Sequence, residues 1–313
     1  MLKQTYLTEW TGDKNMTKKL LLIVNNITGN NRNAVRTFDI VRNFSKYGYE
    51  VTVFPVYPES QLSLQEYLER YQYDRVVCVG GDGTLSHTVN NVMKLDYKPV
   101  IGYLPAGTTN DFSKNFDLTT DIDTACEIIA SECSVEYDLG VFNDKYFNYV
   151  ASFGPLSATS YNTDQKAKNM LGYAAYILNG IGSIGDILSS RCHVRVETEN
   201  RTFEGDYIFG AISNSLSVAG MKVNGMTREN LSDGLFELTL IRYPENGNDL
   251  MSIADSLING NYSTELVEMC KIRKAKIHTD NLTEWTIDGE YGGVAEEADF
   301  SIIPAAVKLS ARI

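Results

Sequence analysis

The sequence predicts two domains of different class, an N-terminal α/β domain with a doubly wound parallel sheet and a C-terminal antiparallel β-sandwich domain. In the first half, helical patterns near residues 34–47 and 62–71 alternate with apolar runs at residues 20–24, 50–56, 75–79 and 100–104. This alternation is typical of a parallel sheet covered on both faces. From about residue 136, short strands separated by turn residues predict antiparallel sheets, interrupted by helical patterns near residues 164–178 and 249–258.

The expected domain boundaries follow from these changes of pattern. Residues 1–16 are a polar N-terminal extension, residues 17–137 form the α/β domain and residues 138–300 form the β-sandwich domain. Residues 301–313 form a C-terminal segment, for which a return to the first domain stays open.

Composition and charge exclude several classes of protein. A hydrophobic content of 43% with 22% charged residues is typical of globular domains. The net charge of -12 argues against a nucleic-acid partner, because binding to phosphate backbones depends on an excess of Lys and Arg. The 5 cysteines are scattered, which favours neither a disulfide framework nor a zinc site and predicts a reducing cytoplasm.

The expectation is also that the chain has no secretory signal and no transmembrane segment. Its polar start lacks the apolar core of a signal peptide. Residues 170–188 have about the length of a membrane span, but Asn179, Asp186 and several glycines argue against one. A basic run at Lys271, Arg273, Lys274 and Lys276 is expected to alternate along a solvated strand, with contact to anionic lipid headgroups as the alternative.

The strongest local signal is the loop GGDGT, which follows the apolar run at residues 75–79 and precedes a helical pattern. Glycine backbones at Gly80, Gly81 and Gly83 let N–H groups approach phosphate oxygens, and a following helix N-terminus favours the same anion. Asp82 would repel phosphate unless it serves a metal, so it favours a nucleotide bound with magnesium. The alternative is a tight turn with a capping Asp.

Two further polar loops follow neighbouring predicted strands. One contains Thr108, Asn110 and Asp111, and the other is NNITG at residues 25–29. Each alone reads as a turn or a helix cap. Because the carboxyl ends of parallel strands meet at one edge of a sheet, the three loops together locate a ligand site there.

These motifs, in this order, resemble the diacylglycerol kinase catalytic family in its soluble bacterial lipid kinase branch. The resemblance rests on GGDGT at residues 80–84, GTTND at residues 107–111 and DGE at residues 288–290, and it runs over the chain from about residue 17. The loop NNITG is similar to the family's N-P-x-S-G. The segment LSDGLFELTLI resembles the family's D-G-L strand start, and NTDQKAKNMLGYAAYILNGI resembles its inter-domain helix.

The resemblance implies an enzyme that uses ATP and Mg²⁺, with a nucleotide-binding first domain and a lipid-binding second domain. It implies that Glu290 accepts the proton of the lipid hydroxyl, that Asp288 is a helper or alternative base, and that Asp82 serves catalysis and a metal. Without the resemblance to the family, the sequence of the DGE segment indicates a hairpin turn with exposed acids. The nucleotide-binding residues that it implies are Asn25, Asn26, Thr28, Gly29, Gly80, Gly81, Asp82, Gly83, Thr84, Leu85, Ser86, Thr108, Asn110 and Asp111.

A second metal site is implied at a turn of the later domain. Asp233, with backbone carbonyls near Asn230 and Leu235, matches a structural magnesium site of the family that is distinct from the catalytic metal. Read without the resemblance, Asp233 and the glycine after it form a turn, although a carboxylate with carbonyl oxygens is also a plausible site for a hard cation.

Diacylglycerol, converted to phosphatidic acid, is the expected acceptor, with phosphatidylglycerol, a sphingoid base or ceramide as alternatives. An NAD kinase also carries GGDGT, but PAGTTNDF stands here in place of that family's Gly-Phe-Leu-Thr segment. Differences from the family pattern at Asn30, Ser86 and His87 leave open a catalytically weakened regulatory protein that binds nucleotide or lipid. The resemblance further implies a cytoplasmic enzyme that touches the inner face of the membrane peripherally, and a homodimer.

Overall fold

The computed structural model describes residues 18–25, 32–57, 60–108, 110–154, 191–218, 221–222, 226–259 and 264–312. The elements of the first half are β1 (Lys18–Asn25), α1 (Arg32–Lys46), β2 (Tyr49–Val56), α2 (Leu64–Arg70), β3 (Arg75–Gly80), α3 (Asp82–Val92), β4 (Val100–Pro105), α4 (Asp111–Asn115) and α5 (Ile122–Ala130). The later elements are β5 (Val135–Phe142), β6 (Lys145–Phe147), β7 (Val150–Phe153), β8 (Cys192–Thr198), β9 (Thr202–Ser213), β10 (Ser217–Val218), β11 (Met221–Lys222), η1 (Arg228–Ser232), β12 (Phe236–Arg242), α10 (Gly247–Asn259), β13 (Val267–Ile272), β14 (Lys274–Ile287) and β15 (Glu290–Leu309).

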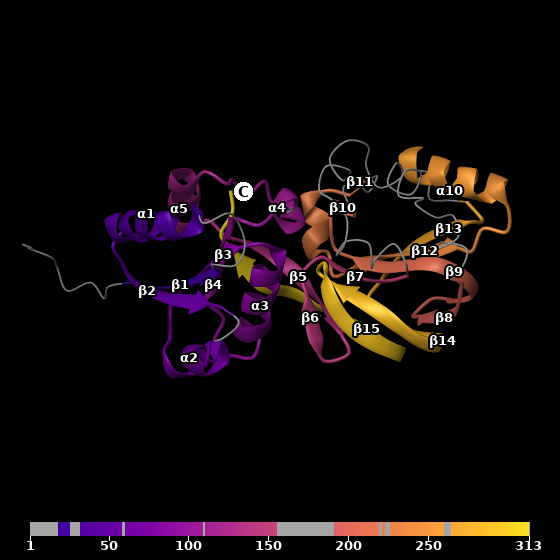
Figure 1. The fold of residues 1–313 in the computed structure, drawn as a ribbon, viewed down its shortest axis with the longest axis horizontal. Helices are drawn as coiled ribbons and strands as arrows, with labels where there is room; N and C mark the ends of the chain where they lie inside the picture. Colours follow the sequence, from indigo (N-terminus) through magenta and orange to yellow (C-terminus); the bar gives the residue numbers. More distant parts are fainter. Residues whose placement is uncertain are drawn as a thin grey trace, which may run out of the picture.

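The first lobe, from β1 to α5, is built on four parallel strands in the order β2-β1-β3-β4. Side chains alternate across the strand, so Leu21 and Ile23 of β1 point into one core and Leu22 and Val24 into the other. Helices α1 and α5 cover one face of this sheet, and α2 and α3 cover the other (Figure 1). Burial on both faces explains why these strands are continuous apolar runs.

The second lobe, from β5 to β14 together with the first half of β15, is built on antiparallel strands. They curl around a core that includes Trp285, Phe153, Phe236 and Phe300, each almost fully buried. Helix α10 packs on the outer side of β9 and β12, where Ile253 and Leu257 contact a smaller apolar cluster. The prediction of an α/β part followed by an antiparallel β part is therefore confirmed.

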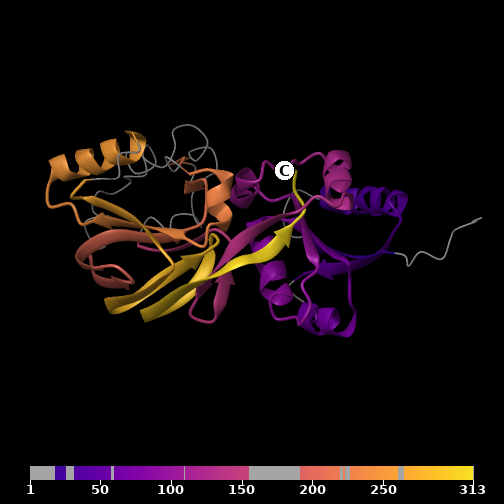
Figure 2. The ribbon, with the colours of Figure 1, turned by 180° about the vertical axis from the view of Figure 1, so that it is seen from behind.

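Hydrogen bonds join the two lobes through one long strand, so the antiparallel strands of the second lobe are continuous with the sheet of the first. The described strands, apart from the β10–β11 pair, form one branched sheet of 13 strands. The 20-residue β15 pairs with β14 in its first half and with β5 in its second half. Its last residue, Leu309, pairs in parallel with Ile101 of β4, and Figure 2 shows this end running into the first lobe. The strand is long enough to belong to both lobes, which the short strand patterns did not reveal.

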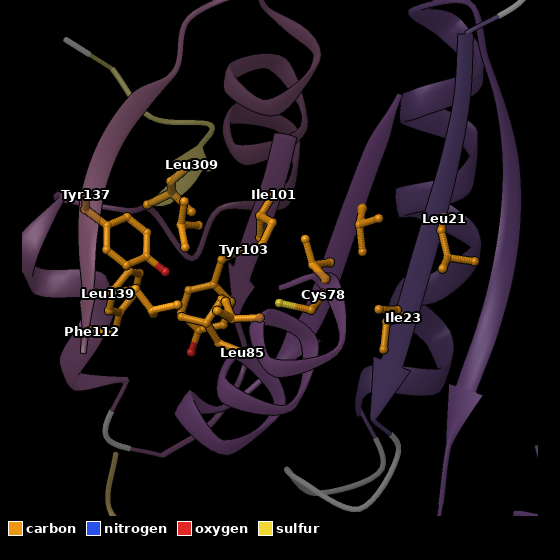
Figure 3. Packing of buried hydrophobic residues seen from close by; sticks show 14 of the residues in the cluster. Leu21, Ile23, Cys78, Leu85, Ile101, Tyr103, Phe112, Tyr137, Leu139 and Leu309 are labelled. Atoms are coloured by element: carbon orange, nitrogen blue, oxygen red, sulfur yellow. The ribbon is translucent and has the colours of Figure 1, made fainter. Parts of the chain in front are cut away.

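A shared apolar cluster fixes the two lobes against each other. Tyr137 of β5 and Leu309 of β15 face Leu85 of α3, Tyr103 of β4 and Phe112 of α4 (Figure 3). The rings of Phe112 and Tyr137 lie 5.3 Å apart between centroids. Because α3 and α4 each begin at one of the predicted ligand loops, this cluster holds both loops to the strands of the second lobe.

Two expectations fall on parts of the chain that the structure does not cover. The predicted helix near residues 164–178 and the apolar stretch at residues 170–188 lie outside the described residues. Among the helices that are described, none combines the length and the apolar character needed to cross a bilayer.

Candidate active site

The GGDGT loop lies at the end of β3, where it turns directly into α3. A Cβ atom at Gly80 would collide with the side chain of Thr84, and one at Gly107 would come within 2.5 Å of Gly81 Cα. The backbone N–H of Ala106 also donates to the carbonyl of Gly80 at 2.8 Å. The two predicted loops therefore pack directly on each other, and glycine is required where their backbones meet.

Asp82 is the first residue of α3 and connects the two loops. Its Oδ2 accepts the backbone N–H of Asp111 at 2.8 Å, and its Oδ1 accepts the hydroxyl of Tyr103 at 3.3 Å. Burial raises the pKa of Asp82 to about 6, the Asp111 N–H opposes this rise, and the charges of Asp111 and Asp288 add to it. A carboxylate held among other carboxylates in this way is suited to a cation, because bound positive charge would restore its ionised form.

The other predicted nucleotide-binding side chains differ in how accessible they are. The amide of Asn110 exchanges two hydrogen bonds of 3.0 Å with the backbone of Gly107, in the left-handed conformation with φ 47°. Thr84 is buried and accepts a hydrogen bond from Asn25, and Leu85 is fully buried in the core. These side chains shape the loops, and the backbone N–H groups of Thr84 and Leu85 donate to the carbonyl of Gly81 at 3.0 and 3.2 Å, within the first turn of α3.

Of the remaining predicted residues, Ser86 is half-buried and Thr108 is exposed at the loop surface. Asn26, Thr28 and Gly29 lie outside the described residues.

The DGE segment is a two-residue hairpin turn between β14 and β15. Asp288 and Gly289 have φ values of 49° and 80°, the left-handed pair of a tight hairpin, and Ile287 pairs with Glu290 across it. Glu290 is exposed. A Cβ atom placed on Gly83 would lie 2.7 Å from Glu290 Oε1. The acid of the second lobe is thus brought beside the predicted phosphate loop of the first.

Asp288, in contrast, is turned into the protein and is only 2% exposed. Its Oδ1 accepts the backbone N–H groups of Asn148, Tyr149 and Val150 at 3.1, 3.0 and 3.3 Å. Its Oδ2 accepts the backbone and the side-chain amide of Asn148, both at 2.8 Å. Burial raises the pKa of Asp288, and these donors oppose the rise. Because both oxygens are already used, the geometry favours a positioning role for Asp288 over a role as base.

Two asparagines that sequence reasoning missed complete the site. Asn148 links Asp288 to the hydroxyl of Tyr137, which donates to Asn148 Oδ1 at 2.7 Å. Asn90 of α3 exchanges hydrogen bonds of 3.0 and 3.1 Å with the backbone of Tyr146, and so fixes the helix to β6. Their only signal in the sequence was a polar residue within an otherwise apolar pattern.

The residues around Asp82 fit a metal that arrives together with a nucleotide. No group of three or more His, Cys, Asp or Glu side chains suited to a metal occurs among the residues that the structure describes. Mg²⁺ is commonly bound by one or two carboxylates, with phosphate oxygens and water completing its shell. One buried carboxylate at the start of α3 matches that pattern.

Comparisons with known proteins show which chains this one is similar to. Residues 19–142 match the sequence model of the diacylglycerol kinase catalytic domain. A diacylglycerol kinase of Staphylococcus haemolyticus is 28% identical over 283 residues, which cover 88% of this chain and 83% of the relative. One of Bacillus subtilis is 26% identical over 286 residues, covering 88% and 91%. A crystal structure of a diacylglycerol kinase from Bacillus anthracis has the same fold, with a TM-score of 0.73, 19% identity, and coverage of 96% of this chain and 99% of that one.

Proposed function

Since the chain belongs to the diacylglycerol kinase catalytic domain family and is therefore a lipid kinase, we propose that it transfers the γ-phosphoryl group of ATP to the free hydroxyl of diacylglycerol, forming phosphatidic acid and ADP. The observation that carries this proposal is the position of Glu290, which approaches Gly83 from the other lobe. Phosphoryl transfer needs phosphate-binding groups and a proton acceptor at one place, and this contact supplies both. The names of the relatives support diacylglycerol as the acceptor.

The proposed step assigns a distinct task to each part of the site. The backbone N–H groups of Gly81, Asp82 and Gly83, at the N-terminus of α3, bind the phosphate oxygens. The lipid hydroxyl oxygen forms a bond to the γ-phosphorus while the bond to the leaving oxygen of ADP breaks. Glu290 accepts the hydroxyl proton, and Asp288 holds the turn that presents Glu290. Mg²⁺, when held by Asp82, supplies neutralisation of the phosphate charge.

We also propose that the enzyme works at a membrane surface, because diacylglycerol resides in the bilayer. Exposed Glu290 and Tyr291 lie at the tip of the β14–β15 hairpin, so a lipid headgroup that rises out of the bilayer could reach the base. Flotation of the protein with liposomes that contain diacylglycerol tests this contact. Failure to float with any lipid composition would contradict it.

The reaction itself is tested by product analysis. The purified protein is incubated with labelled ATP, Mg²⁺ and one acceptor at a time: diacylglycerol, phosphatidylglycerol, ceramide, a sphingoid base or NAD. Labelled phosphatidic acid is the expected product, and phosphorylation of another acceptor in its place would overturn the choice of substrate.

Glu290→Gln tests the base. We expect it to lose turnover by about 10²–10⁴-fold while calorimetry shows unchanged ATP binding, because a proton acceptor acts in the transition state. Glu284→Gln is the matched control, since Glu284 is an exposed acid on the same hairpin. Normal turnover in the Glu290 variant would refute the assignment of the base.

A further inference from the structure

The carboxylate of Asp233 lies in a turn between η1 and β12, and it is surrounded by hydrogen-bond donors. Its Oδ1 accepts the backbone N–H of Leu235 at 2.9 Å. Its Oδ2 accepts the side-chain amide of Asn230 at 3.0 Å and the ammonium group of Lys271 at 2.8 Å. Both oxygens are therefore occupied by N–H groups of the protein itself.

Lys271 also faces a second, deeply buried acid. It lies directly opposite Glu237 on the neighbouring strand, with Nζ 3.8 Å from Glu237 Oε1. Glu237 is 3% exposed, and neither of its carboxylate oxygens has a hydrogen-bond partner among the described residues. The ammonium group thus stands between two carboxylates and is the nearest positive charge to both that the structure describes.

This arrangement does not fit the structural magnesium ion that the resemblance implies at Asp233. Mg²⁺ requires oxygen ligands in near-octahedral geometry at about 2.0–2.1 Å. The side-chain oxygen of Asn230 is used by the backbone of Thr227 at 2.9 Å, and the contacts of Asp233 are all with donors. A divalent ion beside Oδ2 would meet the ammonium group of Lys271, which like-charge repulsion opposes.

We propose that the ammonium group of Lys271 is the built-in counter-ion of Asp233 and Glu237, and that it takes the place of a structural metal ion in this chain. Lys271 itself is exposed, but Glu237 is buried, so removing the lysine would leave that buried carboxylate uncompensated. A chain without this lysine would therefore need another cation at the same point. The positive charge is covalently attached and is therefore present whatever the metal concentration.

The turn that Lys271 stabilises also holds the strand that joins the two lobes. The N–H of Gly234, next to Asp233, donates to the buried carboxylate of Asp138 at 2.6 Å. The other oxygen of Asp138 accepts the N–H of Ala305 at 2.7 Å, at the irregularity of β15 between Ile303 and Val307. Charge compensation at Asp233 thus supports the path of β15 towards the first lobe.

Thermal unfolding of the full-length protein without nucleotide tests this proposal, with either EDTA or MgCl₂ present. We expect wild-type Tm to be the same in both buffers, and elemental analysis of the desalted protein to find no stoichiometric metal. Lys271→Met should melt lower by roughly 2 to 4 °C and should regain part of that loss in MgCl₂. Lys276→Met, at an exposed position of β14, is the matched control and should respond to neither change.

The opposite results are equally clear. A wild-type Tm that falls in EDTA and recovers with Mg²⁺, with the response abolished in Asp233→Asn, would show a resident metal and overturn the proposal. A Lys271→Met variant that melts like the wild type would overturn it as well. If Lys271→Met fails to fold, Lys271→Arg keeps the charge and must show the metal-independent Tm of the wild type.

Discussion

Replacing Asp288 with Asn is expected to destabilise the fold, although the change is isosteric and lies within the DGE motif. The carboxylate accepts hydrogen bonds from the side-chain amide of Asn148 and from the backbone N–H groups of three consecutive residues, 148–150. In the variant, one carboxylate oxygen becomes an NH₂ group, which cannot accept.

The size of the effect can be worked out from these contacts. The smallest loss keeps the amide oxygen at the position of Oδ1, with its three donors, and turns NH₂ towards the two donors of Asn148 at 2.8 Å. Two hydrogen bonds to a charged acceptor are then lost, each worth about 1.5–3 kcal/mol. Rotation of the Asn148 amide would recover about 1 kcal/mol through one neutral bond. We therefore expect the free energy of unfolding to fall by about 2–5 kcal/mol.

Urea unfolding followed by circular dichroism measures this change, and lipid phosphorylation is measured on the same preparations. Glu290→Gln serves as the comparison, because an exposed substitution normally alters the free energy of unfolding by no more than about 0.5 kcal/mol. The two variants should therefore separate, with Asp288→Asn less stable and Glu290→Gln stable but inactive. If Asp288→Asn unfolds at the wild-type urea concentration and yet loses activity, Asp288 takes part in the chemistry and the positioning role is refuted.

Three further changes test the neighbouring contacts. Gly83→Ala should lower kcat about 10–100-fold, because the Cβ of the new alanine displaces the Glu290 carboxylate. The stability to urea should stay at or above that of the wild type, because alanine favours the helix. Full activity would show that the contact between residue 83 and Glu290 is unimportant. Burial raises the pKa of Asp82 from 3.8 to about 6 in the folded protein. The folded state therefore favours the neutral carboxyl group, and the resulting stabilisation is fully present below pH 3.8 and is lost as the pH rises through 6. Asp82→Asn should therefore raise the free energy of unfolding by about 1–3 kcal/mol at pH 8 and leave it nearly unchanged at pH 4. Urea titration at both pH values measures this. An equal effect at both would contradict the argument from burial. Asn90→Ala removes two hydrogen bonds to the backbone of Tyr146 and should lower the free energy of unfolding by about 1–2 kcal/mol in the same assay. An unchanged free energy of unfolding would mean that these two hydrogen bonds do not hold α3 to β6.

The sequence predicted the first lobe well because its signals are local. A strand buried on both faces must be apolar along its whole length, so residues 20–24 and 75–79 were identified within β1 and β3. The glycines of the phosphate loop were equally visible. The close approach of Gly107 to Gly81 explains why such residues stand at the ends of two neighbouring strands.

What the sequence could not predict depends on register between distant strands. The resemblance implied that Glu290 is the base and left Asp288 as a helper or alternative base. In the structure Asp288 faces inward to Asn148, 140 residues away, while Glu290 faces the loop of the other lobe. The pairing of Lys271 with Asp233 follows from the alignment of β12 with β13. The basic run was expected on one strand, but Arg273 lies between β13 and β14, which interrupts the alternation.

The position of Glu290 relative to the GGDGT loop is set by β15. Glu290 is the first residue of this strand, and Leu309, its last, pairs with β4, the neighbour of the strand that carries GGDGT. A shift of one residue in the register of β14 and β15 would turn Glu290 to the opposite face of the sheet. The tight turn at Asp288 and Gly289 and the clamp on Asp288 both oppose such a shift. The buried Asp288 therefore helps to fix the position of the exposed Glu290, the proposed base.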